Sequence, residues 1–89
     1  MVLKADGGVP ETLAGFLRSR FRSAIRGALG PDDPLFSSGI VDSFGVLELI
    51  AFLEDTFHIV IDPSRYELTE FDTINKIAAL VEGIRRQGR

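Results

Sequence analysis

The stretch that decides the fold is GIVDSFGVLELI, residues 39–50, in which turn-forming residues give way to a run of apolar ones. Asp42 and Ser43 stand where that run begins. Both residue types are favoured at helix N-termini because their side chains accept a hydrogen bond from a free backbone N–H. Since apolar residues continue to Phe57, the sequence predicts a helix over residues 43–57. Either Asp42 or Ser43 can cap it, and the role of the other residue is left open.

Upstream of this stretch, apolar residues recur at steps of three and four from Pro10 or Glu11 to the pair Gly30-Pro31, with arginines between them. This spacing is typical of an amphipathic helix, and Gly-Pro is a strong stop signal. The sequence therefore predicts a first helix of roughly five turns. The residues expected on its inner face are Leu13, Phe16, Leu17, Phe21, Ala24, Ile25 and Leu29.

Between and after these helices the chain alternates turn signals with apolar anchors. Residues 30–42 are rich in turn formers, but four apolar residues should pack this loop down. Residues 58–61 are expected to form an extended connector whose apolar residues enter the core. Asp62 and Pro63 can start a short third helix that ends near Leu68. Asp72 can cap a last helix, whose inward residues are Ile74, Ile77, Ala78, Leu80, Val81 and Ile84.

The 89 residues are expected to form one all-α domain, 1–89, with an ordered core at about 10–85 and frayed termini. Three longer helices, a short third helix and a long first loop predict a small four-helix bundle. The chain has no cysteine, which excludes disulfides and thiolate zinc sites. It shows neither a signal-peptide pattern nor an apolar run long enough to span a membrane. We therefore expect a cytoplasmic monomer that does not bind membranes.

The predicted helix 43–57 is apolar almost all round, so its apolar side chains cannot all fit one inward stripe. The stripe with suitable spacing for the core is Leu47, Ile50, Leu53 and Phe57. Apolar residues beyond that stripe should border a partner or an apolar group. They are Phe44, Val46, Leu49 and Phe52.

Charge is distributed unevenly along the chain. Residues 1–30 hold five basic and two acidic residues, a net +3, whereas residues 31–59 hold six acidic and no Lys or Arg. Among the acids of this middle segment, Glu48, Glu54 and Asp55 lie on the helix after Ser43, which predicts a basic partner. The arginines of the first helix could contact nucleic acid, but with a pI near 5.0 a solvated surface is the better interpretation, so no nucleic-acid partner is expected.

Ser43 could be a helix cap, a nucleophile or an attachment point for a group added by another enzyme. Catalysis is disfavoured because the single histidine, His58, lies about 20 Å from Ser43 along the helix. No GxSxG elbow is present either. A helix N-terminus does stabilise a phosphate, which suits an attached phosphodiester. No catalytic residue and no metal site are expected.

The segments LFSSGIVDSFGVLELIAFLEDTF and IVIDPSRYELTEFDTINKIAALVE resemble the acyl carrier and peptidyl carrier protein family, over residues 11–84. The resemblance implies that Ser43 carries a 4′-phosphopantetheine arm derived from coenzyme A, with Asp42 as its motif neighbour. It implies that a phosphopantetheinyl transferase attaches the arm. It also implies that acyl or aminoacyl ligases or transferases load the arm's thiol with a thioester, and that downstream biosynthetic enzymes use the cargo. Residues 62–72 have few apolar anchors, so we expect the short third helix and its flanks to form a mobile wall of the cargo site; the alternative is a tight connector that is rigid once Phe71 packs.

Two residues depart from the pattern of fatty-acid carriers, which often have Leu after the serine and an acid at the next position. Phe44 and Gly45 occupy those places, and Gly45 would leave space beside the arm. With the basic first helix, these departures favour a stand-alone carrier of a specialised pathway. The alternative function is an unmodified helical interaction module that docks through the acidic helix.

Overall fold

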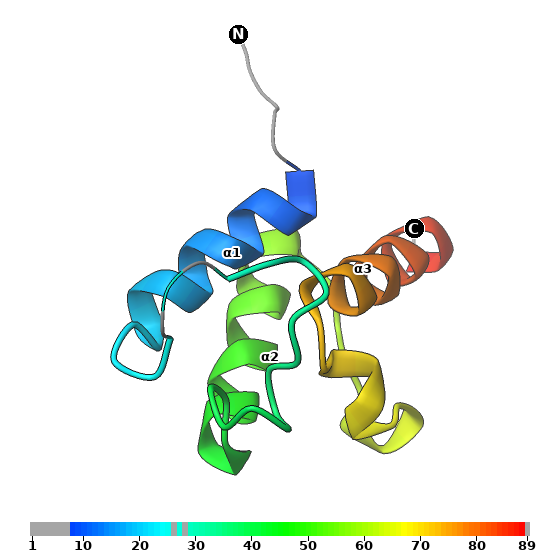
Figure 1. The fold of residues 1–89 in the computed structure, drawn as a ribbon. Coiled ribbons are helices and arrows are strands. Elements are labelled where there is room, and N and C mark those ends of the chain that lie inside the picture. Colours follow the sequence, from blue (N-terminus) through cyan, green and yellow to red (C-terminus); the bar gives the residue numbers. More distant parts are fainter. Residues whose placement is uncertain (1–7, 26, 28, 89) are drawn as a thin grey trace, which may run out of the picture.

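The computed structural model describes residues 8–25, 27 and 29–88, and within these it is all-helical, as predicted. Its elements are α1 (Gly8–Arg20), α2 (Ser43–Phe57), the 3₁₀ helices η1 (Pro63–Arg65) and η2 (Leu68–Phe71), and α3 (Ile74–Gly88). Figure 1 shows α1 crossing α2 and α3 beside them, in contact with α1, with the 3₁₀ helices below α3. None of the described helices is both long and apolar enough to cross a lipid bilayer.

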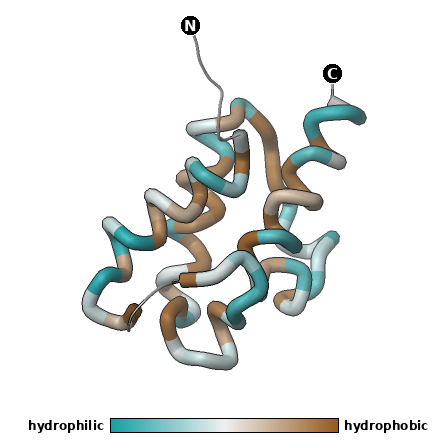
Figure 2. Tube along the Cα trace, turned by 45° about the horizontal axis from the view of Figure 1, so that its top comes forward, coloured by the Kyte–Doolittle hydropathy of each residue, from teal (hydrophilic) through white to brown (hydrophobic). Residues whose placement is uncertain are grey.

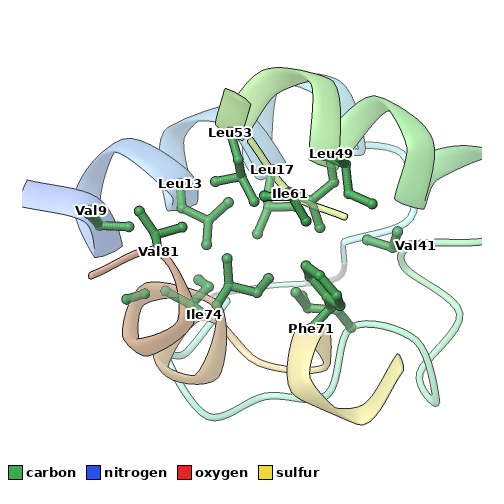
Figure 3. Close-up of a cluster of buried hydrophobic side chains, with 14 of the residues drawn as sticks. Val9, Leu13, Leu17, Val41, Leu49, Leu53, Ile61, Phe71, Ile74 and Val81 are labelled. Atoms are coloured by element: carbon green, nitrogen blue, oxygen red, sulfur yellow. The ribbon is translucent and has the colours of Figure 1, made fainter. Parts of the chain in front are cut away.

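One hydrophobic core joins α1, α2, η2 and α3, whereas η1 contributes no buried residue. Side chains from α1, α2, η2, α3 and both connecting segments point toward one another (Figure 3). Bands of apolar and polar residues alternate along α1 and α3 (Figure 2), as expected for helices that bury one face. The most deeply buried side chains are Val9, Leu13, Leu17, Leu35, Val41, Leu49, Leu53, Ile77 and Val81.

Helix α1 is shorter than the periodicity predicted, because it ends at Arg20 rather than near Leu29. The Phe21 N–H still donates to the Leu17 carbonyl at 2.9 Å, but the Ala24 N–H then turns back to the Phe21 carbonyl at 2.9 Å. Leu29 is nevertheless buried. The apolar spacing does not distinguish residues of a helix from loop residues that are also buried. The predicted first helix was therefore wrong beyond Arg20.

The long loop does pack down as predicted. Leu35 and Val41 are buried, and the Val41 N–H donates to the Leu35 carbonyl at 2.9 Å. Asp72, between η2 and α3, holds this loop in place, because its carboxylate accepts the Phe36 N–H at 2.8 Å. Asp72 therefore does not cap α3 as predicted; the Thr73 hydroxyl accepts the Lys76 N–H at 3.0 Å instead.

The segment after α2 was predicted in part. Residues 59–61 form no helix and Ile59 and Ile61 are buried, but His58 has a left-handed backbone rather than an extended one, and Val60 is exposed instead of entering the core. Asp62 caps the following turn by accepting the Ser64 N–H at 3.1 Å, as predicted. The single short helix is instead two 3₁₀ helices, η1 and η2, since residues 66 and 67 interrupt it.

Helix α2 has the predicted bounds but turns a different face inward. Leu49 is fully buried, whereas Leu47, predicted in the core, is 60% exposed. Ile50 and Leu53 are buried as expected, and Phe57 is half-buried. Because apolar residues surround the helix, the sequence did not determine which face of α2 is buried. The residues of other elements expected in the core that are only half-buried are Phe16, Phe21, Ile25, Leu80 and Ile84, and Ala24, also expected there, is exposed.

The chain ends were expected to fray. Helix α3 continues through residues 85–88, and Arg89 and residues 1–7 lie outside the described residues. Fraying therefore stays a prediction.

Candidate functional site

The start of α2 answers the question of which residue caps the helix. Asp42 has extended backbone angles and is the N-cap, and its carboxylate accepts the Gly45 N–H at 2.8 Å. Its carbonyl accepts the Val46 N–H at 2.9 Å, the first helical bond. Ser43 is therefore the first residue inside the helix, and its hydroxyl is not needed for capping.

Ser43 is exposed at the positive end of α2, and no hydrogen bond of its hydroxyl is found in the part of the chain that the structure describes. The first N–H groups of a helix lack helical acceptors, and together with the helix dipole they stabilise an anion. These features fit a phosphodiester on Ser43, since the hydroxyl is accessible and the added negative charge lies at the favourable end of the helix.

The loop before Ser43 is fixed by a tight turn at Gly39 and by a buried side chain at Val41. Gly39 adopts a left-handed backbone conformation with φ of 86°, which residues with a Cβ rarely adopt, and thereby turns the chain toward α2. Val41 is buried immediately before Asp42. These anchors fix where α2 starts and hence where Ser43 lies.

Gly45 has a packing role that the sequence did not indicate. It is buried, and a Cβ on it would lie 2.9 Å from Cε1 of Phe21 and 3.0 Å from Cγ1 of Val41. The expectation that Gly45 leaves space beside the arm stays a prediction; the position that a Cβ would take is already filled by the Phe21 ring. The glycine therefore allows Phe21 to pack close to the first turn of α2.

The predicted partner residues divide into exposed and packed side chains. Phe44 is 81% exposed. Val46 and Phe52 are half-buried rather than open, and Phe52 stacks on Phe16 with ring centroids 4.1 Å apart. Leu47, which was assigned to the core, is exposed one turn beyond Ser43 and extends the apolar surface around Phe44.

The acidic side chains of α2 have different surroundings. Glu48 forms an ion pair with Arg20, with a 2.6 Å distance between carboxylate oxygen and guanidinium nitrogen. Glu54 is half-buried, and its carboxylate accepts the Ile61 N–H at 2.8 Å, which ties the connector to α2. Asp55 is exposed. The three charges therefore do not form one uniformly free acidic surface.

A groove of about 330 Å³ lies between the end of α1 and the first turn of α2, and Asp42 and Phe44, the sequence neighbours of Ser43, line it. We call it the α1–α2 groove. Its lining includes Arg20, Phe21, Ile40, Asp42, Phe44 and Glu48. Sequence reasoning missed it because the turn after Arg20, which supplies one wall, was assigned to a helix.

His58 lies at the opposite end of α2 from Ser43. It has a left-handed backbone with φ of 57° and ends the helix, since its N–H donates to the Glu54 carbonyl. The 15 residues of α2 span about 22 Å, so the imidazole cannot act as a base for Ser43. Within the described residues, no three His, Cys, Asp or Glu side chains gather as a metal site would require.

Comparisons with known proteins identify the family of the chain. A family model described as the phosphopantetheine attachment site matches residues 16–81. The chain is 33% identical over 69 residues to the D-alanyl carrier protein of Streptococcus suis, which covers 78% of this chain and 85% of that protein. It is 41% identical over 54 residues to the D-alanyl carrier protein of Streptococcus uberis, covering 61% of this chain and 65% of that protein.

The family match covers most of the chain, including α2, and the relatives are stand-alone carriers. Members of this group are in general not catalytic themselves and work with a phosphopantetheinyl transferase and biosynthetic enzymes. The chain belongs to the phosphopantetheine attachment site family and is a carrier that presents acyl or aminoacyl groups on a covalent 4′-phosphopantetheine arm.

Proposed function

We propose that Ser43 is the residue that bears the arm and that Asp42 positions it. The observation that carries this proposal is the division of roles at the start of α2. Asp42 accepts the capping hydrogen bond from Gly45, and the exposed Ser43 hydroxyl is left for modification. A phosphodiester at this position gains from the helix dipole without removing a bond that the fold needs.

Attachment is a phosphoryl-type transfer carried out by a separate transferase. The Ser43 hydroxyl oxygen forms a bond to the phosphorus of coenzyme A that bears pantetheine, and the bond from that phosphorus to the bridging oxygen breaks. Adenosine 3′,5′-bisphosphate leaves with the electron pair, and the hydroxyl proton passes to a base on the transferase. The attached arm supplies a thiol that holds cargo as a thioester. The chain itself contributes an accessible hydroxyl and a docking surface and acts as a non-catalytic carrier.

We further propose that the cargo is an aminoacyl group and that D-alanine is the first candidate. The support is that the relatives in two streptococcal species are named D-alanyl carrier proteins. The carrier would then be loaded by an ATP-dependent ligase of a dedicated pathway. We place it in the cytoplasm, because coenzyme A and ATP are available there, and its monomeric state stays a prediction.

Intact-mass measurement tests the attachment site. After incubation with coenzyme A and a broad-specificity phosphopantetheinyl transferase, the chain should gain the mass of one phosphopantetheinyl group. Ser43→Ala should gain none, while Ser37→Ala, at an exposed serine of the preceding loop, should gain it fully. Modification of Ser43→Ala would overturn the assignment. An unmodified wild-type chain would instead support the interaction-module alternative.

The modified protein then tests the cargo. With ATP and a D-alanine–carrier ligase, it should acquire one alanyl group that hydroxylamine removes, as expected for a thioester. L-alanine and a medium-chain fatty acid serve as competing substrates. Preferential loading with the fatty acid by its own ligase would contradict the aminoacyl proposal without affecting the attachment site.

We propose that partners contact the α2 surface made by Phe44, Val46, Glu48, Phe52, Glu54 and Asp55. Asp55 is the sharpest charge test, because it is exposed, whereas Glu48 and Glu54 also make contacts within the chain. Asp55→Lys should slow priming several-fold at low salt and less at high salt, because charge steering acts on association. Glu82→Lys, on α3, is the matched control. Equal rates for the two variants would place the docking surface elsewhere.

A further inference from the structure

The α1–α2 groove adjoins the proposed attachment point. Asp42 and Phe44, the two neighbours of Ser43 in sequence, both line it. Its other wall comes from Arg20 and Phe21, at the turn that ends α1. A group attached to Ser43 therefore starts at the rim of this groove.

The groove lining offers one cation, Arg20, and two aromatic rings to the first part of the arm. It also holds two carboxylates, of which that of Glu48 is paired with Arg20 and that of Asp42 caps α2. The first part of the arm consists of a phosphodiester anion followed by a carbon with two methyl groups. Arg20 supplies a cation whose guanidinium carbon lies 5.6 Å from the centre of the Phe21 ring. Its ion pair with Glu48 uses one nitrogen, and a guanidinium carries five N–H donors, so donors remain for a phosphate. The Phe21 and Phe44 rings offer apolar surface to the methyl groups.

The opposite side of α2, toward α3, is closed by packed side chains. Leu49, Leu53 and Ile77 are completely buried there, and Ile61 and Ile74 are at most 4% exposed. In Figure 3 the labelled side chains of α2 and α3 point toward one another across this space. Close packing of this kind must be displaced before a chain can enter. The α1–α2 groove needs no such displacement.

We infer that the phosphate and dimethyl portion of the arm lies in the α1–α2 groove, with Arg20 binding the phosphate and Phe21 contacting the methyl groups. This inference rests on the proposed attachment at Ser43. With the arm in this position, the turn after α1 belongs to the carrier site. Arg20 then orients the arm before a partner enzyme binds.

Nuclear magnetic resonance of uniformly ¹³C,¹⁵N-labelled protein carrying an unlabelled arm tests it. Modification at Ser43 is first verified by intact mass and peptide mapping. Isotope-filtered spectra should then show nuclear Overhauser contacts between the arm's methyl protons and the Phe21 ring. The amides of Ser23 and Ala24, which line the groove but are remote in sequence from Ser43, should shift on modification.

A pair of arginine variants isolates the contact. Arg20→Gln, with unchanged helical circular dichroism, should lose most of the contact intensity and of the Ser23 amide shift. Arg18→Gln, on the same helix but not among the groove residues, should keep both. Equal behaviour of the two variants would overturn the role of Arg20.

The remaining outcomes are distinct. Contacts from the arm to Ile61 or Ile77 would show that it enters between α2 and α3, and no contacts at all would show that it stays in solvent. Either result overturns the inference and leaves the attachment at Ser43 intact. Failure to gain mass at Ser43 would remove the proposed function and the inference together.

Discussion

Gly45→Ala is the substitution whose effect the structure determines most directly. In an ordinary helix this change stabilises by roughly 0.5–1 kcal/mol, because alanine loses less backbone entropy than glycine. At Gly45, however, the new Cβ would lie 2.9 and 3.0 Å from two carbons of the Phe21 ring and 3.0 Å from Cγ1 of Val41. The Val41 side chain is buried and has no free space to move into, so the Phe21 ring and the backbone of the loop before α2 must shift.

Overpacking of this kind costs typically 1–3 kcal/mol, which exceeds the gain in helix propensity. We therefore expect a net loss of about 1 kcal/mol and, for a domain of this size, a Tm lower by about 4–8 °C. Thermal and urea denaturation followed by circular dichroism would measure it.

Gly83→Ala is the matched control, because Gly83 is inside α3 and a Cβ there would meet nothing within 4 Å. It should raise stability by roughly 0.5–1 kcal/mol. In a Phe21→Ala background, Gly45→Ala should cost less than in the wild-type chain, because of the three close contacts only the one to Cγ1 of Val41 remains. If Gly45→Ala stabilised the protein as much as Gly83→Ala, the close packing of Phe21 on α2 would be refuted.

Three further outcomes are expected. Leu49→Ala should cost about 2–5 kcal/mol in urea denaturation and the exposed Leu47→Ala much less, and the opposite order would mean that α2 is turned the other way. The Ser64 hydroxyl and N–H, both bonded to the Asp62 carboxylate, hold the pKa of Asp62 below its ordinary value. Their contribution to stability is thus present above the ordinary pKa and is lost as pH falls through the lowered one. Ser64→Ala should raise the pKa measured by carboxyl ¹³C titration, and an unchanged pKa would contradict this assignment. Amides in residues 62–72 should exchange faster than those of the three α-helices and change on cargo loading, whereas uniform protection in both states would rule out a mobile wall.

Much of the fold and the position of the candidate site were predicted from local chemistry. The start of α2 is local, because an Asp-Ser pair before an apolar run offers a cap within three residues of the N–H it bonds. The all-α class followed from helical spacing. The Asp62-Pro63 turn was predicted for the same reason, since both partners of its hydrogen bond are close in sequence.

Tertiary structure decided the features that depend on partners distant in sequence. Apolar spacing alone continued the first helix to Leu29, whereas in the structure Phe21 leaves the helix and packs on Gly45. The inward face of α2 was likewise undetermined, because its apolar residues surround the helix and only the surrounding elements select Leu49 over Leu47.

The site shows the same division. The sequence by itself determined that a serine stands at a helix start in an acidic segment. Only the folded chain decided that Glu48 pairs with Arg20 and that Asp72 anchors the loop instead of capping α3. The physical reason is that hydrogen bonds and ion pairs between residues about 30 positions apart depend on how the chain closes on itself, which no local pattern encodes.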